Sequence, residues 1–262
     1  MTIGYRRWRE QSWLLNRMTL RDLVRAYFTY PAIQVYLALL AGCVVAVAVT
    51  AEAILPVVLS AAAACLLYPL VWYALHRWVL HGSWPYKTPY TAALWKRVHF
   101  DHHQHPNDLA VLFGGLHTTL PTIVLATIPV GWLIGGLPGA AAALAGGLGM
   151  TCFYEFCHCI QHLAYTPRWE FLRRIKRLHL AHHFHNEDGN YGITNYLWDR
   201  LLTTYYEKPS QVPRSPTVRN LGYAGAEAER YPWVADLTRA EQRDRPGRSM
   251  SDTDPPELVG RG

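Results

Sequence analysis

Histidine is the residue whose spacing in this chain most clearly predicts chemistry. The sequence has 13 histidines, all between His76 and His185, and ten of them form four regularly spaced groups. The ten are His76, His81, His99, His102, His103, His158, His162, His179, His182 and His183. Helical residues three or four apart share a face, so the H-x-x-H-H and H-x-x-x-H groups can each present several imidazoles together. Protonated imidazoles would repel one another, whereas neutral imidazole is the commonest metal ligand, so the pattern predicts a metal site.

The pair His76 and His81 needs a special local structure. Residues five apart are separated by about 140° around an ideal α-helix. For this pair to converge, we expect a helix end or local unwinding between its two members.

The number of histidines predicts two metal ions. A catalytic zinc typically has three protein ligands and an open position, so ten histidines are too many for one ion. Two ions with about five histidines each would leave a position for oxygen or water. Imidazole suits iron, zinc, copper and nickel alike. Nearby carboxylates can orient the ring N–H groups of such ligands or be ordinary surface charges, and the candidates are Asp101, Glu155 and Asp199. We predict no catalytic residue beyond the metal ligands.

Three long uncharged runs must position these groups. Lys, Arg, Asp and Glu are absent from residues 26–51, 53–75 and 109–154, although the chain of 262 residues has a net charge of +6. Uncharged apolar runs of about 20 residues or more are typical of transmembrane helices. They exclude an ordinary soluble globule, a disordered chain and a disulfide scaffold. The segment 135–139, Gly-Gly-Leu-Pro-Gly, predicts a break in the third run.

The sequence therefore predicts an all-α integral membrane protein with about four transmembrane helices in two hairpins and a helical cytoplasmic cap that holds a histidine-rich dinuclear metal site. Basic residues lie at the termini and between the hairpins, so the positive-inside rule predicts that both termini and the metal site are cytoplasmic. We expect a basic interfacial segment at residues 1–25 and a membrane-embedded domain at residues 26–207. Residues 208–262 are expected to form a Pro-rich loop and a largely disordered tail.

The motifs in combination resemble the fatty acid hydroxylase/sterol desaturase superfamily of integral-membrane di-metal oxygenases. Besides the histidine groups, the resemblance rests on Tyr154-Glu155 before His158 and on two stretches near the end of the similar region, Asn190-Tyr191-Gly192 and Trp198-Asp199-Arg200. It covers roughly residues 70–206. The histidine spacing is most similar to the fatty acid 2-hydroxylase branch, and the final stretches look closer to the sterol desaturase branch.

The resemblance implies a set of cofactors and partners. The ten histidines named above would bind two iron ions, with zinc as an alternative occupant of the purified protein, and O2 would be the co-substrate. Members of the acyl branch often carry a fused haem electron-carrier domain. The 262 residues leave none for it, so we expect a separate electron-transfer protein as the donor. No nucleic-acid partner is expected.

The predicted reaction is O2-dependent hydroxylation of an unactivated C–H bond of a membrane lipid, with a fatty acyl chain as the first candidate. Side chains cannot attack alkyl C–H bonds, so such chemistry is delegated to a metal that activates oxygen. The lipid would enter from the bilayer, and the Arg-rich, Ala/Gly-rich composition favours a bacterial cell membrane.

Two alternatives stay open. One is a desaturase, oxidase or hydroxylase of a sterol, carotenoid or other polycyclic lipid. The other, outside the enzymes, is a metal transporter or sensor. Transport needs polar residues along the spans, and these spans have almost none.

Overall fold

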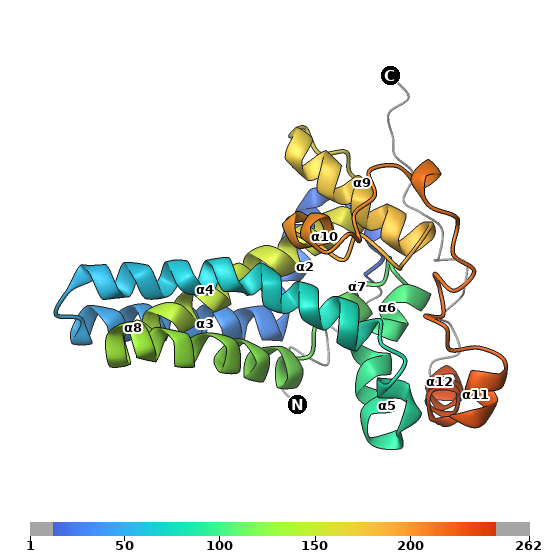
Figure 1. The fold of residues 1–262 in the computed structure, drawn as a ribbon, viewed down its shortest axis with the longest axis horizontal. Helices are drawn as coiled ribbons and strands as arrows, with labels where there is room; N and C mark the ends of the chain where they lie inside the picture. Colours follow the sequence, from blue (N-terminus) through green and yellow to red (C-terminus); the bar gives the residue numbers. More distant parts are fainter. Residues whose placement is uncertain (1–12, 245–262) are drawn as a thin grey trace. The chain divides into compact units, whose positions relative to one another are not determined.

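The structure is a computed structural model that describes residues 13–244, and helices dominate it (Figure 1). Within these residues there is no strand, only an isolated antiparallel bridge between Leu14 and Asp108. The helices are, in chain order, η1 (Leu15–Arg17), α2 (Leu20–Thr29), α3 (Pro31–Thr50), α4 (Ile54–Ala74), η2 (Leu75–Leu80), η3 (Pro85–Lys87), α5 (Pro89–Trp95), η4 (Lys96–Phe100), α6 (Asp101–Gln104), α7 (Leu109–Leu112), α8 (Leu116–His162), α9 (Glu170–Phe184), α10 (Leu197–Leu201), η5 (Pro209–Gln211), α11 (Ala226–Arg230) and α12 (Trp233–Asp244). The predicted all-α fold is confirmed.

The chain divides into two compact units. Residues 24–72 and 114–157 belong to the first, which we call the membrane unit. Residues 13–23, 73–113 and 158–244 belong to the second, which we call the histidine unit because it contains all ten histidines of the four groups.

Within the described residues, three helical stretches are long and apolar enough to cross a membrane: Pro31–Thr50 (α3), Ile54–Leu80 (α4 with η2) and Leu109–His162 (α7 with α8). In the membrane unit, large apolar side chains face outward, with Val49, Leu66 and Leu133 each three-quarters exposed or more. Such exposure is unfavourable in water and suits a lipid environment. The chain is a membrane protein, as predicted.

The break predicted at residues 135–139 is confirmed. Helix α8 has non-helical backbone at Gly135 and Gly136, so it consists of two arms. Gly136 has φ 58°, a left-handed conformation that glycine adopts without strain. Gly131 and Gly139 let the arms approach closely, because a Cβ at Gly131 would lie 2.3 Å from the carbonyl oxygen of Gly139. The count of four spans and their orientation stay predictions.

The C-terminal region differs from the expected loop and disordered tail. Helices η5, α11 and α12 lie within residues 209–244, and residues 245–262 are outside the described part of the chain. Leu221, Tyr223 and Val234 are buried in a cluster with Trp95 and Phe100. The polar, Pro-rich composition of the segment predicts a loop, because its apolar side chains are few. Burial of these few side chains nevertheless stabilises the segment. The predicted basic segment at residues 1–25 is described only from residue 13 onward.

Candidate metal centre

The structure brings all ten predicted histidines together in two sets of five. In each set, one potential ligand nitrogen per residue lies within 4.8 Å of all the others. The first histidine group consists of His76, His81, His99, His103 and His182. The second histidine group consists of His102, His158, His162, His179 and His183. All are buried except His81, which is partly buried.

Adjacent residues serve different groups. His102 and His103 follow one another on α6, and His182 and His183 follow one another on α9, yet each pair divides between the two groups. Neighbouring side chains on a helix point about 100° apart, so one helix can supply ligands to two centres. The H-x-x-H-H spacing therefore serves two sites at once.

A π-helix brings His76 and His81 together. Helix η2 is a π-helix, and the backbone N–H of His81 donates to the carbonyl of His76 at 3.0 Å. A π-helix pairs residues five apart, so both side chains lie on one face. Their Nε2 atoms are 3.2 Å apart. This is the local unwinding that the five-residue spacing requires.

The ring nitrogens in each group converge as ligands of a shared ion would. Nε2 of His81 lies 2.8 Å from Nε2 of His99 in the first group. In the second group, Nε2 of His162 lies 2.9 Å from Nε2 of His179.

Several buried ring nitrogens lack a hydrogen-bond partner within the described part of the chain, and this shows whether a metal ion would fit the two groups. Nε2 of His103, Nε2 of His182 and both ring nitrogens of His183 have no hydrogen-bond partner among the described residues. A buried polar atom left in this way costs about 1–3 kcal/mol. A transition-metal ion in each group would satisfy such atoms, because neutral imidazole nitrogen is a good donor to these metals. The donor set fits two metal ions.

Burial keeps the histidines neutral. For the histidines outside the three apolar stretches, burial is the largest cause of the lowered pKa. Neighbouring imidazoles lower most of these pKa values further. These histidines are His81, His99, His102, His103, His179, His182 and His183. The pKa of His103 falls to about 3. Neutral imidazole is the form that binds metal, so the site is ready for metal at neutral pH.

The metal-free protein should therefore lose stability in acid. Between the folded pKa values and the ordinary histidine pKa of about 6.5, the unfolded chain binds protons that the folded chain does not. The free energy of unfolding is thus at its full value above this window and falls as the pH falls through it. Thermal unfolding in detergent at about pH 7.5 and about pH 5.5 should show a lower midpoint in acid. The metal-loaded protein should lose more stability, because protons also displace metal. Equal midpoints for the metal-free protein would contradict this prediction.

Backbone carbonyls orient three imidazole rings of the first group. Nδ1 of His76 donates to the carbonyl of Tyr191 at 2.6 Å, and Nδ1 of His182 donates to that of Gly189 at 2.8 Å. Nδ1 of His103 donates to the carbonyl of Val218 at 2.9 Å. A carbonyl can only accept, so Nδ1 carries the proton and the Nε2 lone pair is directed into the group. The sequence did not predict these three acceptors. Every residue has a backbone carbonyl, so no residue type marks the one that a histidine will contact.

The three candidate carboxylates have other contacts. Asp101 accepts from the Lys96 ammonium at 2.8 Å. Glu155 belongs to the membrane unit, where its Oε1 accepts from the backbone N–H of Gly114 at 3.4 Å. Asp199 accepts from the backbone N–H groups of Tyr191 and Gly192 at 2.8 and 2.9 Å. Asp199 thus acts on His76 indirectly, by fixing the residue whose carbonyl His76 binds.

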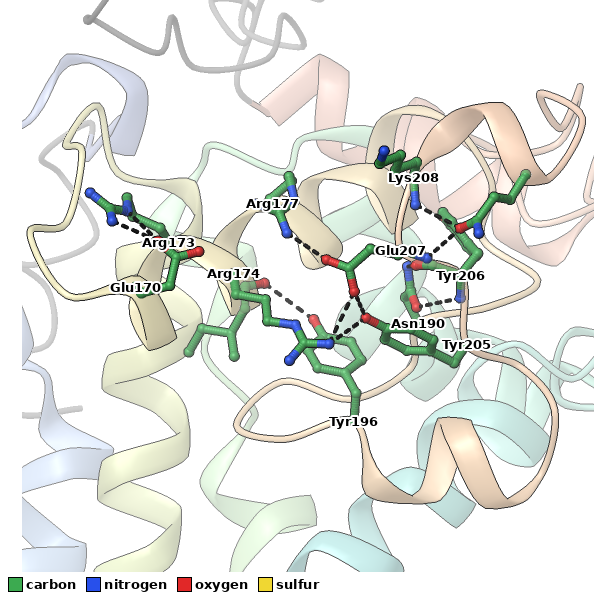
Figure 2. A network of polar contacts seen from close by, with 12 residues as sticks. Glu170, Arg173, Arg174, Arg177, Asn190, Tyr196, Tyr205, Tyr206, Glu207 and Lys208 are labelled. Carbon is green, nitrogen blue, oxygen red and sulfur yellow. Dashed lines mark hydrogen bonds and ion pairs between the residues drawn. The ribbon is translucent and has the colours of Figure 1, made fainter.

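Helix α9, which carries three of the ten histidines, is tied to the segment that follows it in the chain (Figure 2). Glu207 accepts from Arg174 at 3.0 Å and from Arg177 at 2.6 Å. Asn190 donates to the carbonyl of Tyr206 at 2.9 Å and accepts from its N–H at 3.2 Å. The Asn190 contacts fix to Tyr206 the stretch that presents Gly189 and Tyr191, and the Glu207 contacts hold the residue next to Tyr206 against α9.

Lys176 connects α9 with the end of α8. It is buried, and its ammonium donates to the carbonyls of Ile160 and Leu163. Burial lowers the pKa of Lys176 to about 8. A cation beside the last carbonyls of a helix is stabilising, so Lys176 holds the end of α8 that carries His162.

The fold and the site together define a class: all-helical membrane proteins with two buried sets of five histidines. A family model described as fatty acid hydroxylase matches residues 61–204, and the chain belongs to this family. The resemblance inferred from the motifs is confirmed.

Individual relatives and a solved structure are also similar. The chain is 32% identical over 146 residues to the ceramide very long chain fatty acid hydroxylase of Saccharomyces cerevisiae, covering 53% of this chain and 35% of the relative. It is 31% identical over 134 residues to a beta-carotene hydroxylase of Paracoccus sp., covering 46% of this chain and 70% of the relative. The solved structure of full-length scs7p, in which only the hydroxylase domain is visible, matches with a TM-score of 0.58 and 26% identity, over 70% of this chain and 68% of that one. The chain spans well under two thirds of the length of the yeast relative.

Proposed function

We propose that the protein is an O2-dependent hydroxylase that acts on an unactivated C–H bond of a fatty acyl chain in a membrane lipid. The observation that carries this proposal is the pair of buried five-histidine groups in a chain of the fatty acid hydroxylase family. One iron ion would be held by each group. The membrane-embedded hydroxylase domain would comprise residues 26–207, which include the matched residues 61–204.

The chain's own residues would orient the imidazole rings, exclude bulk water from the centre and keep the imidazoles neutral. Two bound iron ions would supply the activation of O2 that side chains cannot provide. The carbonyls of Gly189, Tyr191 and Val218 would keep three imidazoles in the tautomer that directs Nε2 to the metal. Burial would keep bulk water from the reacting centre and keep the imidazoles neutral.

The substrate and the electrons would arrive from different sources. The outward-facing apolar side chains of the membrane unit support entry of the lipid from the bilayer. Electrons would come from a separate electron-transfer protein. We propose that the termini and the metal site are cytoplasmic and that the host is a bacterial cell, as the charge distribution and composition suggest.

A carotenoid is the second candidate substrate. The beta-carotene hydroxylase relative is 31% identical, and the match covers 70% of its length, a larger share than for the yeast relative. A hydroxylase of a carotenoid or another polycyclic lipid would use the same metal centre. It would differ in the shape of the lipid that the membrane unit admits.

Lipid mass spectrometry would test the proposed function. Bacterial cells, with and without carotenoid synthesis, would express the unmodified chain, His182→Ala, or His117→Ala as a control outside both histidine groups. We expect acyl lipids one oxygen heavier with the unmodified chain and with His117→Ala, and none with His182→Ala. Oxygenated carotenoids in place of hydroxylated acyl lipids would favour the second candidate. A product two hydrogens lighter would indicate a desaturase and contradict the proposal.

A further inference from the structure

The segment 212–241, which we call the C-terminal clasp, lies outside the residues that match the family model. It nevertheless contacts two ligand-bearing parts of the metal centre. One is the helical segment from Lys96 to Gln104, which carries His99, His102 and His103. The other is the end of α9, just after His182 and His183.

The clasp binds α6 at His103 and at the adjacent Gln104. The Val218 carbonyl accepts from Nδ1 of His103 at 2.9 Å. The Arg219 guanidinium donates to the backbone carbonyl of His103 at 3.3 Å, and the side-chain amide of Gln104 donates to the carbonyl of Arg219. The clasp therefore fixes both the ring and the backbone of this histidine.

A second set of contacts holds the clasp to the end of α9. The backbone N–H of Ser215 donates to the carbonyl of His185 at 2.8 Å. His185 donates from Nε2 to the carbonyl of Val212 at 3.0 Å, and Asn186 donates to that of Pro213 at 2.9 Å. These bonds fix the stretch of the clasp that leads into Val218.

Buried side chains anchor the far end of the clasp. Val234 is fully buried in the cluster that includes Trp95 and Phe100. The buried Lys96 ammonium binds Asp101 at 2.8 Å and Glu241 of α12 at 2.6 Å. The anchor thus lies on the same helical segment that carries His103.

The two histidine groups differ in how their rings are held. Three rings of the first group donate Nδ1–H to backbone carbonyls. In the second group, Nδ1 of His102, His162 and His179 is buried without a hydrogen-bond partner among the described residues. Losing an outer partner of a metal ligand typically weakens metal binding by about 10–100-fold. The first group is therefore the better organised one.

We propose that the C-terminal clasp is a positioning element that strengthens metal binding by the first histidine group, the tighter of two unequal metal sites. It does so through the Val218 carbonyl, which directs Nε2 of His103 into the first group. This inference rests on the proposed metal centre. It adds that the metals bind in order, first group before second, and that Val218, which lies beyond the family match, contributes to this order together with the carbonyls of Gly189 and Tyr191.

Cobalt(II) titration of the metal-free chain in detergent would test the clasp. Two variants, used as backgrounds, allow each group to be titrated separately: His183→Ala leaves the first group complete, and His182→Ala leaves the second complete. Each substitution below is combined with each of these two variants. Gln104→Met removes the amide that binds Arg219 and keeps a side chain of similar length. Val234→Asp breaks the anchor, and Leu237→Asp, at an exposed position of α12, is its matched control.

We expect the first group to bind cobalt at least about tenfold more tightly than the second. Gln104→Met and Val234→Asp should weaken the first group by about tenfold and leave the second unchanged, whereas Leu237→Asp should change neither. If Val234→Asp does not fold, as judged by helical circular dichroism, Gln104→Met decides. Equal affinities in the two backgrounds, or equal weakening of both groups, would overturn the clasp proposal alone. No cobalt uptake by the unmodified chain would overturn the proposed metal centre itself.

Discussion

Replacing His182 with alanine should remove the metal ion of the first histidine group, and replacing the adjacent His183 should remove the ion of the second. Each residue offers one potential ligand nitrogen to its own group of five. Each variant should therefore retain about one ion per chain, held in the intact group. Both should lose hydroxylation by at least about 100-fold, since even the loss of an outer partner costs 10–100-fold.

Elemental analysis and product formation should be measured on the same preparations. The matched control is His117→Ala, because His117 is exposed and belongs to neither group. It should keep two ions and full activity. Loss of both ions from either variant would contradict two separable sites, as would retention of both ions by His182→Ala. The double variant should bind neither ion tightly.

Replacing Asp199 with asparagine should loosen the first group without touching a ligand. The buried carboxylate accepts from the backbone N–H groups of Tyr191 and Gly192, and from the Thr204 hydroxyl at 2.9 Å. An asparagine would turn an NH2 group toward one of these donors, so one contact would become a clash of two donors. We expect the free energy of unfolding to fall by about 1–3 kcal/mol, the cost of a buried group left without its partner.

The effect of Asp199→Asn should extend to His76, whose Nδ1 donates to the Tyr191 carbonyl. Metal affinity of the first group should weaken by about tenfold, as expected for a displaced outer partner. Chemical denaturation and metal titration would measure the two effects. Asp236→Asn is the control, because Asp236 is exposed and paired only with Arg239 among the described contacts. Unchanged stability and metal affinity in Asp199→Asn would refute this role.

Local sequence was enough to predict the helices and the histidine groups. Uncharged runs are expected to form helices in a membrane, because only a helix satisfies every backbone group within one apolar segment. The break at Gly135 and Gly136 could be predicted from composition alone, and α8 is divided there. The spacing of His158 and His162 placed both on one face of the same helix.

Only the tertiary structure decided which histidines share a centre. The adjacent residues His182 and His183 look equivalent in the sequence, yet they face different groups. The carbonyl that orients His103 comes from Val218, 115 residues further along the chain.

No sequence pattern marks such an acceptor, because every residue carries a carbonyl and only the packing of distant segments selects one. The same reason explains the clasp. Its few apolar side chains become a stable element only when they are buried against Trp95 and Phe100. The sequence by itself thus determined the candidate ligand types and the helices that carry them, whereas long-range packing determined how the histidines are grouped and oriented.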